Sequence, residues 1–218
     1  MSLDTVVIEP SSNHQASVIW LHGLGDSGEG FAPIVPELKL PNALGVKFIF
    51  PHAPIQPVTI NGGMAMRSWY DIKSLDLDKR ADEQGVQQSA QQVKAIIEQE
   101  LALGIPADKI ILAGFSQGGV ISLYLAPRLD FQLGGVMALS TYMCAPSKLV
   151  DEKQQTELNI FMAHGSFDDV VPTAAGRSAF ELLKAQKYDV SWQEYPMAHQ
   201  VCLEEIKAIS QWLIERLS

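Results

Sequence analysis

The sequence predicts an α/β fold in which a mostly parallel central sheet is covered by helices on both faces. Apolar runs with the length of strands alternate along the 218 residues with segments of helical periodicity. Several runs are apolar almost without interruption, which is typical of strands that are buried on both faces. No internal repeat, linker or low-complexity tract divides the chain, so we expect one domain over residues 1–218.

The expected strands are short and are bounded by turn residues. Residues 3–8 are a modest example, whereas residues 16–21 are apolar almost throughout and run directly into a glycine-rich loop. Residues 46–50 form another apolar run, which Pro51 closes. The remaining expected strands are one that begins at Ile110 and those at residues 134–139, 158–163 and 190–195.

The clearest helical pattern lies at residues 86–101, where apolar residues recur at steps of three and four with Gln and Lys between them. Gly104 ends this helix and Pro106 prevents its continuation. The other expected helices are residues 30–38, a segment that follows the Ile110 strand and ends near Pro127, residues 174–186 and residues 200–217.

Two connections bear on how a site at the sheet edge is covered. Residues 55–78 lack a clear period because prolines and glycines interrupt them, yet they are rich in apolar side chains. We expect this loop to be tucked onto the core or to line a pocket. Only about 17 residues separate the strands near Leu139 and Leu158, which is too few for a large cap domain.

Composition excludes several function classes. The formal net charge is −9 and no basic run is present, which argues against nucleic acid or an anionic membrane surface as a partner. The chain begins without a basic, apolar signal segment, and no apolar run approaches the roughly 20 residues of a membrane span. Cys144 and Cys202 have no metal-type spacing; one disulfide stays open, but two lone thiols fit a reducing compartment better. We therefore expect a cytoplasmic protein without stable membrane insertion.

The motif around which the chain is organised is Gly114-Phe-Ser-Gln-Gly118, a Gly-x-Ser-x-Gly turn between an apolar strand and a helix. Such a turn strains the serine backbone and exposes the hydroxyl above the sheet, while its glycines allow neighbouring segments to come close. The following helix directs its positive end at the site. We therefore predict that Ser116 is a nucleophile.

A serine nucleophile needs a base, and His199 has the right place in the chain. It lies between the last strand and the last helix, and in proteins with this turn the order along the chain is Ser, acid, His. His164 precedes the acid candidates, and we expect it to hold its own loop. His22 and His52 also end strands, where a structural role fits them.

The acid and the oxyanion hole are predicted from neighbouring loops. The acid is expected after the strand at 158–163, where Asp168 and Asp169 are adjacent, and spacing alone does not choose between them. For the oxyanion hole, the backbone N–H of Gln117 follows the nucleophile, and a second N–H is expected from Leu24 in the glycine-rich loop after the strand at 16–21.

At this point the residues resemble a known family, the carboxylesterase/acyl-protein thioesterase (lysophospholipase-like) branch of the α/β-hydrolases. The matching stretches span nearly the whole chain: Trp20-Leu-His-Gly-Leu-Gly-Asp-Ser-Gly28, Phe50-Pro-His-Ala-Pro54, Trp69-Tyr-Asp-Ile72, Gly114-Phe-Ser-Gln-Gly-Gly119, His164-Gly-x-x-Asp-x-Val-Val-Pro172 and Met197-Ala-His199. Ala198 stands where members of the family usually have Gly.

The resemblance implies an α/β-hydrolase fold without a large cap, esterase or thioesterase activity, no metal or other cofactor, and a homodimer in many members. It places the acid on Asp168, with Asp169 second, and so implies a triad of Ser116, His199 and Asp168. It also implies that the loop around Trp69, with Met66 and Ile60, lines an acyl pocket.

We therefore hypothesise that the protein is a serine hydrolase that cleaves short- to medium-chain acyl esters or thioesters. The substrate is a small molecule or an acylated protein. A lysophospholipase or peptidase on the same fold is an alternative, because fold does not set the substrate. A non-catalytic binding module is a further alternative, although such a protein is expected to lack one of the catalytic groups.

Overall fold

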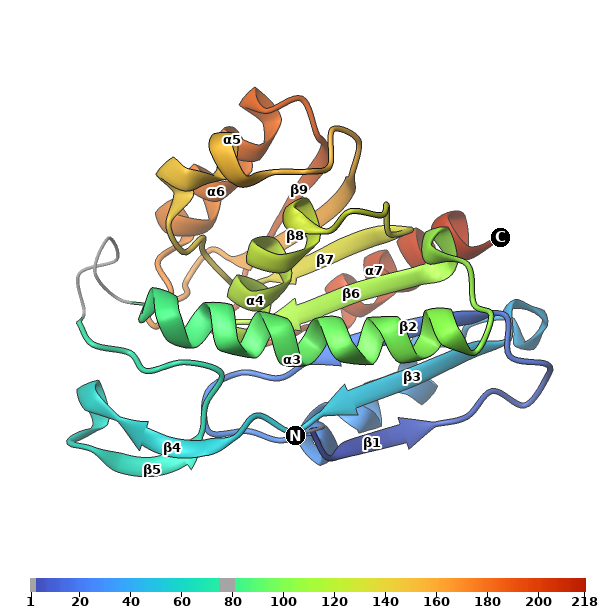
Figure 1. Ribbon diagram of the computed structural model, residues 1–218, viewed down its shortest axis with the longest axis horizontal. Helices are drawn as coiled ribbons and strands as arrows, with labels where there is room; N and C mark the ends of the chain where they lie inside the picture. Colours follow the sequence, from blue (N-terminus) through green and yellow to red (C-terminus); the bar gives the residue numbers. More distant parts are fainter. Residues whose placement is uncertain (1–2, 75–80) are drawn as a thin grey trace.

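The computed structural model describes residues 3–74 and 81–218 and is built on a seven-stranded sheet with the order β1-β3-β2-β6-β7-β8-β9 (Figure 1). β1 pairs antiparallel with β3, and every other pair in this sheet is parallel. The strands are β1 (Thr5–Ile8), β2 (Ala16–Leu21), β3 (Val46–Pro51), β6 (Ile110–Phe115), β7 (Gly135–Leu139), β8 (Asn159–Gly165) and β9 (Asp189–Tyr195).

Every predicted strand is present, with bounds within two residues of the expected ones. β2 is buried at all six positions and β7 at all five, in agreement with their uninterrupted apolar sequences. The edge strands β1 and β9 instead alternate between exposed and half-buried positions, because only one of their faces packs on the core.

Helices cover both faces of the sheet, as predicted (Figure 1). On one face lie α3 (Glu83–Ala102), α4 (Gln117–Leu125) and α6 (Thr173–Ala185); on the other lie α1 (Gly28–Phe31), α2 (Val35–Leu38) and α7 (Leu203–Leu217). The connection between β7 and β8 holds only the short α5 (Leu149–Glu152) and one 3₁₀ turn, so no large cap is present there. The 3₁₀ turns among residues 3–74 and 81–218 are η1 (Ala32–Ile34), η2 (Asn42–Leu44), η3 (Thr59–Asn61), η5 (Ala107–Lys109), η6 (Ala126–Arg128) and η7 (Pro146–Lys148).

Two local predictions were wrong. The helix expected at 30–38 is broken into α1, η1 and α2, because Pro33 and Pro36 each remove a backbone donor and start a new short turn. The segment at 55–78, expected to be irregular, contains a hairpin of β4 (Ile55–Val58) and β5 (Met64–Arg67). Gly62 and Gly63 supply the positive φ angles of its turn, 66° and 78°. Residues 75–78 of that segment lie outside the described part.

Two smaller findings complete the fold. In the described residues no helix is both long and apolar enough to cross a bilayer. Cys144 and Cys202 are both free thiols, as favoured from the sequence, and burial raises the pKa of the Cys144 thiol to about 11. That thiol is protonated at neutral pH, which fits a packing role.

Candidate active site

Ser116 sits at the sharp turn between β6 and α4, with φ 54° and ψ −118°. This is the strained conformation that the Gly-x-Ser-x-Gly motif predicts. The turn is held by its neighbours: the Ser116 N–H donates to the Leu139 carbonyl at 2.9 Å, and the Thr141 hydroxyl donates to the Ser116 carbonyl at 2.7 Å.

Close backbone contacts explain why both ends of the motif are glycine. A methyl group at Gly114 would lie 2.2 Å from the Gly118 carbonyl carbon, and one at Gly118 would lie 2.3 Å from the Leu21 carbonyl oxygen. Both separations are far below contact distance, so strand, turn and helix approach as closely as they do only because these side chains are absent.

The structure brings the three predicted catalytic side chains into one hydrogen-bonded chain. His199 Nε2 lies 2.9 Å from Ser116 Oγ, and His199 Nδ1 lies 2.7 Å from Asp168 Oδ2. Because an ionised carboxylate only accepts, Nδ1–H donates to Asp168 and Nε2 is left to accept from the serine hydroxyl. Asp169, the alternative acid, is exposed, whereas the Asp168 side chain is fully buried.

The surroundings of Asp168 keep it ionised. Burial by itself raises the pKa of Asp168, but hydrogen bonds from His164, His199 and the Val171 N–H outweigh that effect and hold the pKa well below its usual range. The other carboxylate oxygen accepts from the N–H groups of Val170 and Val171 at 3.0 and 2.8 Å. These donors fix the carboxylate in the orientation that meets His199.

The other histidines near the sheet edge hold loops, as expected. His164 Nε2 donates to the Val171 carbonyl at 2.8 Å, which closes the loop that carries Asp168. His22 Nδ1 donates to the Gly23 carbonyl at 2.7 Å, while its Nε2 accepts from the Ala53 N–H at 3.0 Å. Burial lowers the pKa of His22, which keeps this bridging imidazole neutral. His52 accepts from the Gly28 N–H at 3.1 Å.

The loop of Leu24 lies against Ser116, because a methyl group at Gly23 would lie 3.4 Å from Ser116 Cβ. In the described part of the chain neither the Leu24 N–H nor the Gln117 N–H donates to a protein acceptor. Both donors are therefore available to a ligand at this turn. The Gln117 side chain has a role that the sequence did not indicate: its amide binds the Trp69 N–H at 3.0 Å and the Tyr70 carbonyl at 2.8 Å.

The three predicted pocket residues are placed differently from one another. Trp69 is only 1% exposed and its indole N–H donates to the His22 carbonyl at 2.9 Å, so it supports the Leu24 loop from beneath and offers no surface to a ligand. Met66 is half-buried, with its sulfur 3.8 Å from where a methyl group at Gly25 would lie. Ile60 is exposed in η3, and no described contact joins it to Ser116 or His199.

A cavity of about 480 Å³ opens between the loop after β7 and α6, and the sequence reasoning missed it. Tyr142, Met143 and Cys144 form one wall, and Ala175, Ala179 and Leu182 of α6 belong to the other. Tyr142 directly follows Thr141, which binds the Ser116 carbonyl, although none of the predicted site residues lines this cavity. The apolar residues that follow β7 were the available signal.

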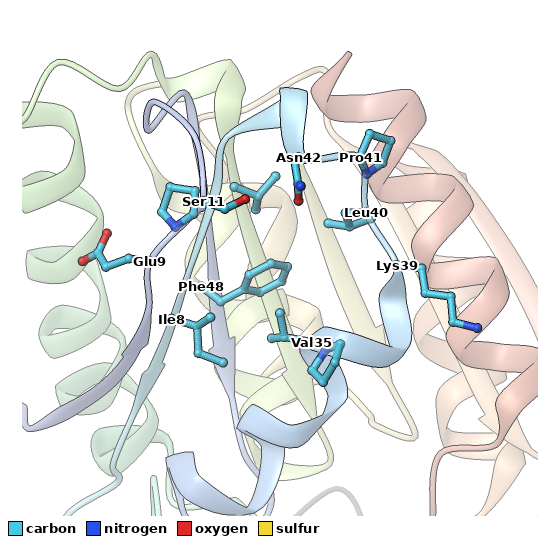
Figure 2. Close-up of a pocket in the computed structure, with 12 residues that line it drawn as sticks. Ile8, Glu9, Ser11, Val35, Lys39, Leu40, Pro41, Asn42 and Phe48 are labelled. Atoms are coloured by element: carbon cyan, nitrogen blue, oxygen red, sulfur yellow. The ribbon is translucent and has the colours of Figure 1, made fainter.

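A second cavity, of about 340 Å³, lies near the end of the sheet where the parallel strand β3 begins, between the end of β1, the start of β3 and α2 (Figure 2). Ile8, Val35, Leu40 and Phe48 form its apolar part. None of the predicted site residues lines it.

Comparison with known proteins identifies the family of this chain. A family profile described as Phospholipase/Carboxylesterase matches residues 3–216. Acyl-protein thioesterase 1 of Neurospora crassa is 41% identical over 223 aligned positions, covering 97% of this chain and 91% of that protein. Acyl-protein thioesterase 1 of Cryptococcus neoformans is 38% identical, with 99% and 98% covered.

Solved structures show the same architecture. Arabidopsis thaliana SOBER1 superimposes with a TM-score of 0.89 and 32% identity, over 94% of this chain and 100% of that one. Zea mays acyl-protein thioesterase 2 superimposes with a TM-score of 0.88 and 28% identity, over 99% of each chain. Because the profile spans nearly the whole sequence and the relatives are this similar, the chain belongs to the phospholipase/carboxylesterase family of α/β-hydrolases and is a carboxylic ester hydrolase.

Proposed function

We propose that the protein hydrolyses acyl thioesters and esters through an acyl-enzyme on Ser116, with His199 as general base and Asp168 as the acid that orients it. The observation that carries this proposal is the continuous hydrogen-bonded chain from Ser116 Oγ through both nitrogens of His199 to Asp168. The strained turn supports it, because this is the backbone conformation in which a Gly-x-Ser-x-Gly motif directs its hydroxyl away from the sheet, here toward His199.

In the first half-reaction, His199 Nε2 takes the hydroxyl proton while Ser116 Oγ attacks the acyl carbonyl carbon. The resulting oxyanion accepts hydrogen bonds from the N–H groups of Leu24 and Gln117, which stabilise it where the negative charge develops. The imidazolium then donates its proton to the leaving thiol or alcohol. In the second half-reaction, His199 removes a proton from water, which attacks the acyl-enzyme and releases the carboxylic acid.

The acyl part of the substrate is the group that the surroundings recognise. The cavity beside Tyr142 and Met143 has several apolar lining residues and begins one residue after Thr141, which binds the Ser116 carbonyl, and Met66 adds an apolar side chain beside the Leu24 loop. We infer a short- to medium-chain acyl group. The names of the relatives add an acylated protein as a candidate substrate, from which the deacylated protein thiol would be the leaving group.

The test is hydrolysis of p-nitrophenyl esters from acetate to palmitate, together with acyl-thioester analogues, by the wild type and by Ser116→Ala. We expect the variant to lose activity by several orders of magnitude while the wild type shows an optimum at short to medium chains. Ser166→Ala, at an exposed serine near the site, is the matched control and should keep wild-type activity.

A fluorophosphonate probe separates the alternatives. Labelling that disappears in Ser116→Ala supports the nucleophile. A wild type that is neither labelled nor active on any ester or thioester contradicts the proposal and favours a binding module. Turnover of lysophospholipids or peptides in preference to acyl esters would move the substrate to the alternatives on the same fold.

A further inference from the structure

Each of the two predicted oxyanion donors shares a peptide unit with a carbonyl that a buried side chain binds. The Gln117 N–H belongs to the peptide that carries the Ser116 carbonyl. The Leu24 N–H belongs to the peptide that carries the Gly23 carbonyl. In a planar trans peptide the C=O and N–H bonds point in opposite directions. A side chain that holds either carbonyl therefore also sets the direction of the N–H on the other side of the peptide.

The carbonyl of the first peptide is held by the hydroxyl of Thr141. This hydroxyl donates to the Ser116 carbonyl at 2.7 Å, whereas the Tyr142 carbonyl, which is also within its reach, is farther away at 3.4 Å. The Ser116 carbonyl also accepts a helical hydrogen bond of α4, from the Val120 N–H at 3.3 Å. The peptide of the Gln117 donor is thus held by two hydrogen bonds on its carbonyl side.

Two features of the backbone accommodate Thr141 beside the turn. A methyl group at Gly119, which directly follows the Gly-x-Ser-x-Gly motif, would lie 2.6 Å from Thr141 Cβ and 2.8 Å from its hydroxyl oxygen. Ser140, which links β7 to Thr141, has a φ of 46°, a conformation that costs energy in a residue with a side chain. A missing side chain and local strain therefore accompany this contact, and strain of this kind is typical of functional positions.

The carbonyl of the second peptide is held by the imidazole of His22. Because its Nε2 accepts from the Ala53 N–H at 3.0 Å, the ring proton is on Nδ1, which donates to the Gly23 carbonyl at 2.7 Å. The Trp69 indole donates to the His22 carbonyl at 2.9 Å, so the peptide before Gly23 is held as well. The peptide of the Leu24 donor is thus fixed on its carbonyl side in the same way as that of the other donor.

The sheet brings these two side chains to the turn from opposite sides of β6. β2 and β7 are the two neighbours of β6 in the sheet. His22 is the first residue after β2, and Thr141 is the second residue after β7. Within the part of the chain that the structure describes, neither side chain is hydrogen-bonded to His199 or Asp168. Any effect that they have on the reaction therefore passes through the two donor peptides.

We propose that Thr141 and His22 are positioning residues of the oxyanion hole, each of which orients and polarises one donor N–H by binding the carbonyl of the same peptide. The inference rests on the proposed function, in which Gln117 and Leu24 supply these donors. A hydrogen bond to a peptide carbonyl polarises the peptide, so its N–H becomes a stronger donor. Both effects act where the oxyanion forms, so they lower the barrier and leave binding of the uncharged ester unchanged.

The test compares Thr141→Val, which keeps the shape of the side chain and removes its hydroxyl, with Thr141→Ser, which keeps the hydroxyl. Both are assayed for kcat and KM on p-nitrophenyl butyrate. Removal of an oxyanion donor costs roughly 10²- to 10³-fold in kcat, and a misaligned donor costs less. We therefore expect Thr141→Val to lose kcat on the order of tenfold to hundredfold with KM little changed, and Thr141→Ser to recover most of that loss.

Ser122→Ala is the matched control. The Ser122 hydroxyl is also buried and also donates to a carbonyl of α4, that of Gly118 at 3.0 Å, but the N–H of that peptide is not a predicted donor. Ser122→Ala should therefore keep the wild-type kcat. Equal losses in Ser122→Ala and Thr141→Val would overturn the proposal, because loss of any buried hydroxyl near the turn would then be sufficient.

The His22 side chain is tested with His22→Asn and His22→Gln. The amide nitrogen in His22→Asn takes the place of Nδ1 and donates to the Gly23 carbonyl, whereas the amide in His22→Gln lies near Nε2 and keeps the contact with Ala53. We therefore expect a higher kcat in His22→Asn than in His22→Gln, with similar KM values. A kcat in His22→Gln that equals or exceeds that of His22→Asn overturns the role of His22.

Affinity for butyl trifluoromethyl ketone is the readout that a merely structural role would not move. Ser116 Oγ adds to the ketone carbon, His199 takes the hydroxyl proton, and the ketone oxygen becomes an oxyanion. The inhibition constant in Thr141→Val should rise by the factor by which kcat/KM falls, while the pH midpoint of kcat/KM stays at the wild-type value. A loss of kcat/KM without weaker inhibition, or with a shifted midpoint, places the damage at the base and overturns the proposal.

Fluorophosphonate labelling of the wild type keeps the two proposals separate. A wild type that neither reacts at Ser116 nor turns over ester contradicts the proposed function and, with it, the roles of Thr141 and His22. An active, labelled wild type whose kcat and inhibition constant are shared by Thr141→Val and His22→Gln contradicts the roles of these two residues alone.

Discussion

Asp168 and Asp169 are adjacent in the chain, but only one of them faces the imidazole. Asp168 lies 2.7 Å from His199 Nδ1 with its side chain fully buried, whereas Asp169 is exposed to solvent. In Asp168→Asn one of the two accepting oxygens becomes an NH2 donor; with the oxygen still on the Val170 and Val171 N–H groups, the amide presents N–H to His199 Nδ1, so the imidazole loses its fixed tautomer. We expect kcat/KM for ester hydrolysis to fall on the order of 10⁴-fold.

Asp169→Asn is the matched control for this experiment and should change kcat/KM little. Equal losses in the two variants would show that charge near the loop matters and that the Asp168–His199 contact does not. A loss confined to Asp169→Asn would move the acid to the neighbouring position.

Because it is fully buried in α7, Glu205 gives stability a pH dependence of opposite sign to that of a paired carboxylate. Its pKa rises from about 4.5 in the unfolded chain to about 8 in the folded protein, so the folded state binds more protons between these values. The contribution of Glu205 to the free energy of unfolding is therefore highest below the pKa of the unfolded chain. It is lost as the pH rises toward 8, by up to about 1.4 kcal/mol per pH unit. Urea unfolding at about pH 5, 6, 7 and 8 should show this slope in the wild type and a flatter one in Glu205→Gln. Parallel slopes in the two proteins would refute the assignment of the buried proton to Glu205.

At the scale of elements, the turn between β6 and α4 depends on close backbone approach. In Gly118→Ala the added methyl group would lie 2.3 Å from the Leu21 carbonyl oxygen of β2. Because backbone on both sides must shift, we expect a loss of about 1–3 kcal/mol in the free energy of unfolding and a large loss of activity.

Gly62→Ala is a useful comparison for Gly118→Ala, because its methyl group meets no atom within 4 Å and only the positive φ of 66° opposes it. It should cost about 1–2 kcal/mol and leave the kinetics of p-nitrophenyl acetate unchanged. If Gly118→Ala proved as active as Gly62→Ala, close packing at the turn would not be a requirement of the site.

The hairpin of β4 and β5 shows why one element escaped sequence analysis. Each of its strands is four residues long, one contains Pro57, and the pair stands apart from the main sheet, so its apolar residues do not alternate as in a half-buried strand. Its order depends on contacts with distant segments, such as the hydrogen bond from the Gly25 N–H to the Arg67 carbonyl at 2.8 Å.

On the scale of the whole molecule, the parallel sheet explains why residues far apart in the chain meet. Ser116, Asp168 and His199 follow the carboxyl ends of β6, β8 and β9, and the loop of Leu24 follows β2. Parallel strands end at the same edge, so the turns after them gather there. The organisation as one domain over residues 1–218 and the homodimer that the family resemblance implies stay predictions.

The alternation of strands and helices, the sharp turn at Ser116 and the candidacy of His199 as its partner could be predicted from the sequence, because they follow from local periodicity, glycine spacing and chain order. Spacing left Asp168 and Asp169 open, the family resemblance implied Asp168, and the tertiary structure brings Asp168 to His199. The burial of Trp69 with its indole on the His22 carbonyl and the burial of Glu205 in the face of α7 became visible only in the tertiary structure. These depend on which side of a loop or helix faces another element. That orientation is set by packing between segments that are distant in the chain, such as Ser116 with His199 at a separation of 83 residues and Ser210 with Leu38 at 172, and no local pattern records it.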